Sequence, residues 1–407
     1  MAEIGLKKLI LDDTTTTGKL LGVVAFMSII AQAPILQTSL PFPPRYVAFA
    51  FWGLLLAYII LYRPIKNIKL PLTIIAFSII YVMYVLLGSF LSKIDFLDST
   101  ILYSYFVSVF IFFVAYFTAQ DLNKKDFRLL SLLIFIATIF FTLNVYFTNL
   151  QEVDFTSRGY EYAQKNTAGM IVLTGAVFGA VFEANSKNMI WKIFSIIMVI
   201  FMVATVILLR SRAVVLSMFV AAFAIILLGK GDIKLRITLG IVILVGLILL
   251  MNEAFYDYFV NTILFGGKDT DNLNDISSGR WEEWETFGVV LGDNWIFGTG
   301  SNKMESFILT VIAEAGVFMG GAMLLFVLNP IRYAFANLNR KNPFVLIFIV
   351  LGITYCFDGI FEALTPLGPG VKCFAYWMLF GIFYGMKGRT DNFAKTILLK
   401  ERSTKWN

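Results

Sequence analysis

Histidine is absent from the 407 residues, and cysteine occurs only twice. A chain without histidine has no Ser-His-Asp triad, no His-ligated zinc site and no histidine proton relay. Cys356 and Cys373 are too few for a disulfide framework or a zinc cluster. They could pair if both lie near an oxidising face, but we favour two separate buried thiols.

Charged residues are also scarce, at 15% of the chain, whereas hydrophobic residues make up 58%. A soluble globular protein has about 25% charged and about 45–50% apolar residues. This composition indicates an all-α, polytopic integral membrane protein that forms a single transmembrane domain over residues 1–407. The net charge of +6 is better explained by lysines and arginines in cytoplasmic loops than by a nucleic-acid surface. Membrane lipid is therefore an expected partner, and nucleic acid is not.

Long apolar runs predict about twelve transmembrane helices, because one span needs about 20 mainly apolar residues. No cleavable signal peptide is expected, since the first apolar run follows a polar stretch. The expected spans are 19–38, 46–62, 70–91, 99–118, 128–148, 167–183, 190–209, 213–229, 235–251, 306–328, 344–363 and 372–387.

The basic residues indicate the orientation of these spans. Most of them fall on the same side as the N-terminus, which predicts that both termini are cytoplasmic and that the long loop 252–305 is outside. The remaining basic residues are placed on the outer side, where topology does not favour them. They are Arg45, Lys93, Arg158, Lys165, Arg210, Arg212, Lys268, Arg280, Lys303 and Lys372.

Two outer segments carry residue types that bind phosphates or sugars. Arg210 and Arg212 flank one serine in a short turn. They are either interfacial anchors for lipid phosphates or an anion-binding pair, and we favour the anion-binding pair. The loop 149–166 contains Arg158, Tyr160 and Asn166, although an ordinary polar loop would have a similar composition.

Within the predicted spans charge is almost absent, and Glu314 is the exception. An acid inside a bilayer is a candidate functional residue. The alternative, slightly favoured, is a structural hydrogen bond to a neighbouring helix, with close packing at Gly316, Gly320 and Gly321. The scarcity of charge across the membrane argues against an ion-coupled transporter.

The loop 252–305 is the most acidic part of the chain. Asp269, Asp271 and Asp275 alternate as in a calcium loop, but the sixth position is not glycine and the twelfth is Arg280 in place of glutamate. No metal site is therefore expected. Trp281 and Trp284 share one face of a predicted helix, which suits a membrane interface or a sugar ring.

Several short motifs follow one another in this topology. They are Arg210-Ser-Arg212, Gly279-Arg280-Trp281, Trp295-Ile-Phe-Gly298-Thr-Gly300, Glu305-Ser306-Phe307 and Ala313-Glu314-Ala315-Gly316. In this order they resemble the O-antigen polymerase and O-antigen ligase superfamily, over roughly 150–325 by motif and over the whole chain by topology. Arg158 and Gly169 also resemble an Arg-x10-Gly pattern of such polymerases.

The resemblance implies a GT-C-like membrane glycosyltransferase at the periplasmic face of the bacterial inner membrane, where 252–305 forms a large periplasmic loop. Its substrates would be undecaprenyl-diphosphate-linked oligosaccharides, with no cofactor and no metal. A chain-length regulator and other O-antigen assembly proteins would be its partners.

The ligases of the superfamily have a His-Asn pair where this chain has Glu305-Ser306. We therefore expect a polymerase of O-antigen, the polysaccharide of lipopolysaccharide. A ligase that transfers glycan to lipid A-core, or a flippase for lipid-linked oligosaccharides, is the alternative.

The resemblance also suggests roles for individual residues. Arg210, Arg212 and Arg280 would stabilise the negative charge on the departing lipid diphosphate. Glu305 would accept the proton of the acceptor hydroxyl. The residues expected to contact substrate are Arg158, Tyr160, Asn166, Trp281, Trp284 and Glu314.

Overall fold

A computed structural model of the chain confirms an all-helical membrane protein. Over the residues that it describes there is no strand, only one isolated β-bridge between Leu338 and Leu398. Seven of its helices are long and apolar enough to cross a membrane. The described residues are 13–43, 45–62, 71–92, 99–150, 164–229, 253–256, 274, 277, 279–300, 303–368, 372–387, 389 and 391–398.

The helices follow the predicted spans closely. The long apolar ones are α4 (Arg45–Tyr62), α5 (Leu72–Ser92), α6 (Thr100–Thr118), α7 (Lys124–Val145), α8 (Lys165–Val181), α9 (Met189–Leu208) and α15 (Phe307–Asn337). Shorter apolar helices are α2 (Thr16–Ile30), α10 (Arg212–Leu228), α16 (Pro343–Asp358) and α17 (Phe374–Gly385). The remaining α-helices are α3 (Pro34–Ser39), α12 (Glu253–Tyr256), α14 (Arg280–Leu291) and α18 (Asn392–Ile397). The predicted span 235–251 lies outside the described residues, so the number of twelve spans stays a prediction, as does the GT-C-like class.

Three predicted spans have different ends in the structure. The span 19–38 is interrupted, because α2 ends at Ile30 and Pro34 begins α3; proline fixes φ and has no N–H to continue a helix. The span 306–328 extends to Asn337 in α15. The span 344–363 ends early, at Asp358, and a turn over 359–368 follows it.

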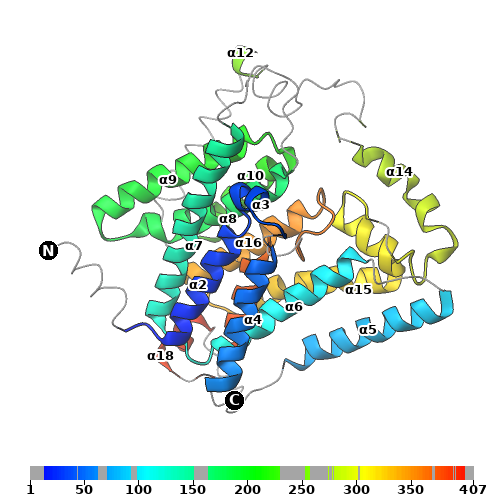
Figure 1. The fold of residues 1–407 in the computed structure, drawn as a ribbon, viewed down its shortest axis with the longest axis horizontal. Coiled ribbons are helices and arrows are strands. Elements are labelled where there is room, and N and C mark those ends of the chain that lie inside the picture. The colour runs from blue at the N-terminus through cyan, green and yellow to red at the C-terminus, as the bar shows by residue number, and fades with distance from the viewer. Residues whose placement is uncertain are drawn as a thin grey trace, which may run out of the picture.

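The helices pack into one bundle. Helix α2 packs against α7 and α4, α8 against α9 and α7, and α16 against α8, α10, α15 and α17. Figure 1 shows α14 at one edge of the molecule, away from α2 and α7. One continuous hydrophobic core joins residues from α2 to α18.

Helix α17 is buried between its neighbours and shorter than a full span. Its 12 residues make it about 18 Å long, against about 30 Å of hydrocarbon. Gly381 and Gly385 let it approach α6 closely: a Cβ at these positions would lie 2.3 Å from the carbonyl oxygen of Phe112 and 2.5 Å from that of Tyr116. Small residues four apart are a frequent means of close helix packing in membranes.

Contacts between loops agree with the predicted alternation of sides. Thr15 N–H donates to Asp126 Oδ1 over 2.8 Å, and Asn339 N–H donates to the carbonyl of Ile397 over 2.7 Å. All four residues belong to segments assigned to the N-terminal side. Segments assigned to the opposite side meet one another in the cluster described below. Which side is periplasmic stays a prediction.

Candidate active site

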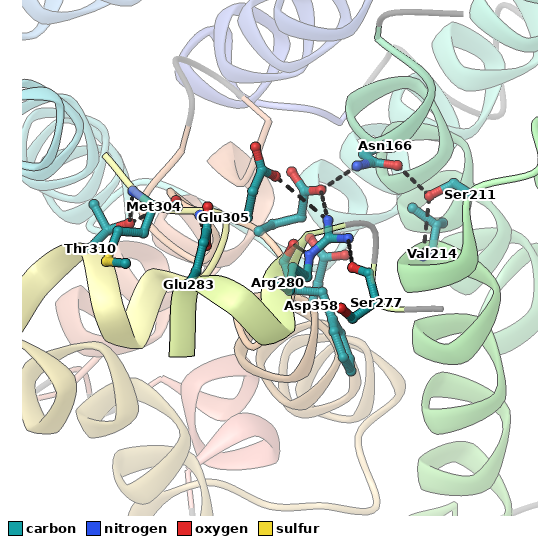
Figure 2. A network of polar contacts seen from close by, with 12 residues as sticks. Asn166, Ser211, Val214, Ser277, Arg280, Glu283, Met304, Glu305, Thr310 and Asp358 are labelled. Carbon is teal, nitrogen blue, oxygen red and sulfur yellow. Dashed lines mark hydrogen bonds and ion pairs between the residues drawn. The ribbon is translucent and has the colours of Figure 1, made fainter. Parts of the chain in front are cut away.

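The first residues of α8 and α10 are joined by hydrogen bonds. Ser211 precedes α10 and accepts the N–H of Val214 at 3.4 Å, as an N-cap does. Its hydroxyl donates to Asn166 Oδ1 over 2.5 Å, and Asn166 Nδ2 donates to Glu362 Oε1. Figure 2 labels Asn166, Ser211 and Val214 in this series of hydrogen bonds. Two helix starts are thereby connected to the turn that follows α16.

Arg280 is the first residue of α14 and is held from two sides. Its Nε donates to the carbonyl of Phe361 over 3.0 Å, and its Nη1 donates to the carbonyl of Ser277 over 3.1 Å. Its Nη2 lies 3.6 Å from Glu305 Oε2 and 3.8 Å from Glu362 Oε1. Both distances exceed a hydrogen bond. Among the described residues, this edge of the guanidinium therefore has ion-pair contacts only.

Glu305 has a fixed backbone and an accessible carboxylate. Its N–H donates to Glu283 Oε2 over 2.8 Å, and Thr310 Oγ1 bonds to both the N–H and the carbonyl of Met304 (Figure 2). Burial raises the pKa of Glu283 above its usual value, although this hydrogen bond opposes the shift. The side chain of Glu305 is 54% exposed. A substrate can therefore reach its carboxylate.

Behind Glu362 lies a buried lysine. Lys372 Nζ lies 3.1 Å from Asp358 Oδ2, 2.9 Å from Thr365 Oγ1 and 3.9 Å from Glu362 Oε2. Burial lowers the pKa of Lys372, but the charges of Asp358 and Glu362 outweigh it and raise the pKa overall. Burial raises the pKa of Glu362, and the charges of Lys372 and Arg280 oppose this. We call Arg280, Glu305, Asp358, Glu362 and Lys372 the Arg280 cluster.

Four helices begin around the Arg280 cluster. Asn166, Ser211 and Arg280 lie at the starts of α8, α10 and α14. Helix α15 begins with Phe307, whose N–H donates to the carbonyl of Gly359 over 2.8 Å. A helix N-terminus carries a partial positive charge and favours anions. The site thus combines positive helix ends, an arginine edge and two carboxylates, which suits an anionic substrate and a proton transfer.

A second polar region surrounds a break in α15. Gly316 has φ 72° and ψ 172°, a conformation that is nearly restricted to glycine. The segment 295–300 fills the break: Val317 N–H donates to the carbonyl of Trp295 over 2.9 Å, and Thr299 N–H donates to that of Ala313 over 2.7 Å. A Cβ on Gly316 would lie 1.9 Å from the carbonyl oxygen of Ile296. Two of the sequence motifs therefore form one structural unit, which we call the α15 break.

Glu314 belongs to the α15 break. It accepts hydrogen bonds from Ser99 Oγ at 2.5 Å, Thr100 Oγ1 at 3.0 Å and the N–H of Ile101 at 3.2 Å. These groups form the start of α6, which leaves its first N–H groups without helical partners. Glu314 therefore caps a neighbouring helix, in agreement with the structural interpretation of this residue.

The structure brings some of the predicted site residues together. Arg280 and Glu305 are in contact, and Asn166 reaches them through Glu362. Burial lowers the pKa of Arg212, and the positive charge of Arg280 lowers it further. Arg210 is buried and has φ 51°, which is uncommon outside glycine.

Other predicted site residues lie apart from these contacts or outside the description. Trp281 and Trp284 are 48% and 47% exposed, and Trp281 Nε1 donates to Glu285 Oε1 over 2.6 Å. Arg158 and Tyr160 lie outside the described residues, as do the calcium-like Asp269, Asp271 and Asp275. Among the described residues no three His, Cys, Asp or Glu side chains form a metal-binding group.

Sequence reasoning missed Glu362 and Asp358. Glu314 was named as the exception among almost uncharged spans, which was wrong. Asp358 and Glu362 also fall inside a predicted span, 344–363. Two acids at the end of an apolar run were the available indication, together with Lys372 directly before the next run. The structure shows why charge is tolerated there: α16 ends at Asp358, and the acids face Lys372 and Arg280.

Comparison with known proteins locates the motifs within a family. Residues 197–319 match the O-antigen ligase family, which confirms the resemblance to the O-antigen polymerase and ligase superfamily. The matched stretch contains Arg210, Arg212, Arg280, Glu305 and Glu314, and it ends before Glu362. A search of curated proteins found no match to the chain.

Proposed function

We propose, with that family match as the premise, that this membrane protein is an O-antigen polymerase. It joins oligosaccharide repeat units carried on undecaprenyl diphosphate, at the periplasmic face of the inner membrane. The matched family consists of glycosyltransferase-like enzymes, which supports group transfer over the flipping of lipid-linked sugars.

The observation that carries this proposal is the Nη2 edge of Arg280. It faces two carboxylates at 3.6 and 3.8 Å without a direct hydrogen bond to either. A phosphate oxygen forms shorter, charge-assisted hydrogen bonds with a guanidinium. The positive charge of Arg280 adds to burial in lowering the pKa of Arg212, and a bound anion would offset this repulsion. The pair suits a lipid diphosphate.

The proposed reaction is a displacement at a sugar carbon. The acceptor hydroxyl oxygen forms a bond to the anomeric carbon, the bond from that carbon to the phosphate oxygen breaks, and the diphosphate leaves with the electron pair. Arg280, with Arg210 and Arg212, stabilises the charge that develops on the diphosphate. Glu305 takes the proton of the attacking hydroxyl. Arg158, Tyr160 and Asn166 contact the substrate, and no metal or cofactor takes part.

A direct test uses purified protein in lipid nanodiscs with undecaprenyl-diphosphate-linked repeat units. We expect products of two and more units together with released undecaprenyl diphosphate. If the protein leaves the lipid-linked repeat units as unreacted single units, although the substrate preparation is known to be competent, the proposal is overturned.

The match to the O-antigen ligase family favours a second candidate, an O-antigen ligase. A deletion strain separates the two activities. Loss of a polymerase leaves lipid A-core that bears one repeat unit, because a separate ligase still attaches single units. Loss of the ligase leaves bare core, with polymer retained on the lipid carrier. The second pattern would replace the polymerase proposal with the ligase.

The proposed side of the membrane is tested with reporter fusions. A periplasm-dependent reporter placed after Asp271 should be active, and one placed after Lys395 should be inactive. Activity at Lys395 and none at Asp271 would place the site in the cytoplasm and contradict the proposed periplasmic site.

A further inference from the structure

Glu362 contacts three separate segments with one carboxylate. Oε1 accepts from Asn166 at the start of α8 and lies 3.8 Å from Nη2 of Arg280 at the start of α14. Oε2 lies 3.9 Å from Nζ of Lys372, just before α17. The side chain is 17% exposed, against 54% for Glu305. Glu362 is thus the enclosed carboxylate of the site and Glu305 the open one.

The turn that carries Glu362 also fixes the plane of the Arg280 guanidinium. The carbonyl of Phe361, the preceding residue, accepts from Nε of Arg280 over 3.0 Å. A guanidinium is planar, so a contact at Nε and another at Nη2 determine its orientation. The turn after α16 therefore contributes two neighbouring groups to one edge of the arginine.

Lys372 keeps the position of Glu362 defined. Its side chain has no exposure to solvent, and Asp358 Oδ2 and Thr365 Oγ1 hold its Nζ at 3.1 and 2.9 Å. A fixed buried cation attracts Oε2 of Glu362, whereas Arg280 lies near Oε1. This arrangement explains why Glu362 stays beside Arg280 without forming a direct hydrogen bond to its Nη2.

We propose that Glu362 is a positioning residue, which orients Arg280 and Asn166 so that the lipid diphosphate meets a preset guanidinium. This inference rests on the proposed function, since it assigns the diphosphate to Arg280. Glu362 lies outside the stretch that matches the family, which ends at residue 319.

The direction in which Glu362→Gln changes the Kd for the diphosphate decides between a positioning role and a purely electrostatic effect. A carboxylate near a diphosphate repels it, so removing the charge of Glu362 without loss of order would tighten binding. Loss of positioning does the opposite, because Arg280 must then be ordered at the moment of binding. We therefore expect Glu362→Gln to weaken diphosphate binding by about ten- to a hundredfold, the range for one lost charge-assisted contact.

The experiment compares full-length wild type, Glu362→Gln, Glu362→Asp and Glu282→Gln in nanodiscs. Glu282 lies on the same helix as Arg280, is exposed, and accepts from Asn274 Nδ2 over 3.1 Å, so it is a matched control. The Kd for undecaprenyl diphosphate and the KM and kcat for lipid-linked repeat units are measured for each. We expect Glu362→Gln to raise Kd and KM together and to change kcat less. Glu362→Asp should recover part of the lost affinity, and Glu282→Gln should have the constants of wild type.

Each outcome bears on one proposal. An unchanged or lower Kd in Glu362→Gln overturns the positioning role, even if wild type forms polymer. A raised Kd with no polymer from wild type retains the positioning role and overturns the proposed polymerase. If Glu362→Gln does not accumulate in the membrane, Glu362→Asp decides, because its shorter side chain moves the charge away from Arg280. An unchanged Kd for that variant overturns the inference.

Discussion

The α15 break and the Arg280 cluster are both polar regions of a membrane protein, but their charges are satisfied to different degrees. At the break, Glu314 accepts hydrogen bonds of 2.5, 3.0 and 3.2 Å, and backbone groups on both sides of Gly316 bond to the segment 295–300. In the Arg280 cluster, Lys372 bonds to Asp358 over 3.1 Å, but its pair with Glu362 measures 3.9 Å, and the pairs of Arg280 with Glu305 and Glu362 measure 3.6 and 3.8 Å.

This difference shows that a charged side chain in a membrane protein does not by itself indicate a functional site. Glu314 has partners for both carboxylate oxygens, so it maintains structure. The edge of Arg280 has long ion pairs, which a phosphate can replace with shorter hydrogen bonds. The comparison predicts that substitutions at the break change stability, and that substitutions in the cluster change turnover or substrate binding.

The largest expected effect is on turnover, in Glu305→Gln. The amide keeps the shape of the side chain but cannot take a proton, so kcat should fall by about a hundred- to ten-thousandfold. Thermal stability should remain that of wild type, because the carboxylate is 54% exposed. The measurement is polymer formation by purified protein over a pH series. Turnover like that of wild type would remove Glu305 from the mechanism.

Next in size is a loss of stability in Gly316→Ala. The new Cβ would meet the carbonyl of Ile296, and φ 72° disfavours alanine, at a cost of about 3 kcal/mol. Gly321→Ala is the matched control, since a Cβ there meets nothing within 4 Å. Thermal unfolding in detergent should therefore separate the two variants. Equal melting temperatures would show that the break tolerates a side chain.

A smaller change is expected for Arg280→Ala, of about ten- to a hundredfold in rate, the equivalent of one lost charge-assisted contact in the transition state. Long-chain polymer should be lost while the protein remains in the membrane, and Arg210→Ala should behave similarly. Arg280→Lys should restore only part, because the planar fork is lost. Lys303→Ala, an exposed cation next to Met304, is the control. Normal polymer from both arginine variants would refute diphosphate binding by these residues.

The smallest effect is expected for Trp281→Ala. Because the ring is about half exposed, stability should change by less than about 0.5 kcal/mol. If the ring binds a sugar, KM for the acceptor should rise by about two- to tenfold. Trp295→Ala should lower stability more than Trp281→Ala, because it also removes a ring contact in which the centroids of Trp295 and Phe318 lie 5.8 Å apart. An unchanged KM for Trp281→Ala would leave it as a membrane-interface residue.

Much of the fold could be predicted because a bilayer requires long apolar segments. The predicted span 99–118 and the observed α6, Thr100–Thr118, differ by one residue. The C-terminal end of α16 could not be predicted in the same way, since apolar residues continue past Asp358 while the helix stops there. The motif order indicated Arg280 and Glu305, which lie 25 positions apart in the chain and 3.6 Å apart in space.

The rest of the site depends on packing that no local pattern records. Asn166 and Glu362 are separated by 196 positions, and their hydrogen bond exists because α8 and α16 pack together. The hydrogen-bond partners of Glu314 were also hidden, since Ser99 and Thr100 precede it by more than 200 positions. The sequence showed that Glu314 lies within a predicted span, but it did not show which groups donate hydrogen bonds to it.

The spread of the Arg280 cluster along the chain has a consequence for biosynthesis. Asn166 and Lys372 are both connected to Glu362, so the cluster is complete only when the chain has been synthesised as far as α17. At about 5–20 residues per second, the ribosome needs roughly ten to forty seconds between these two positions. During that interval the start of α8 has already been synthesised, yet the Arg280 cluster is still incomplete. Nascent chains in the translocon should therefore be inactive until the last spans are inserted.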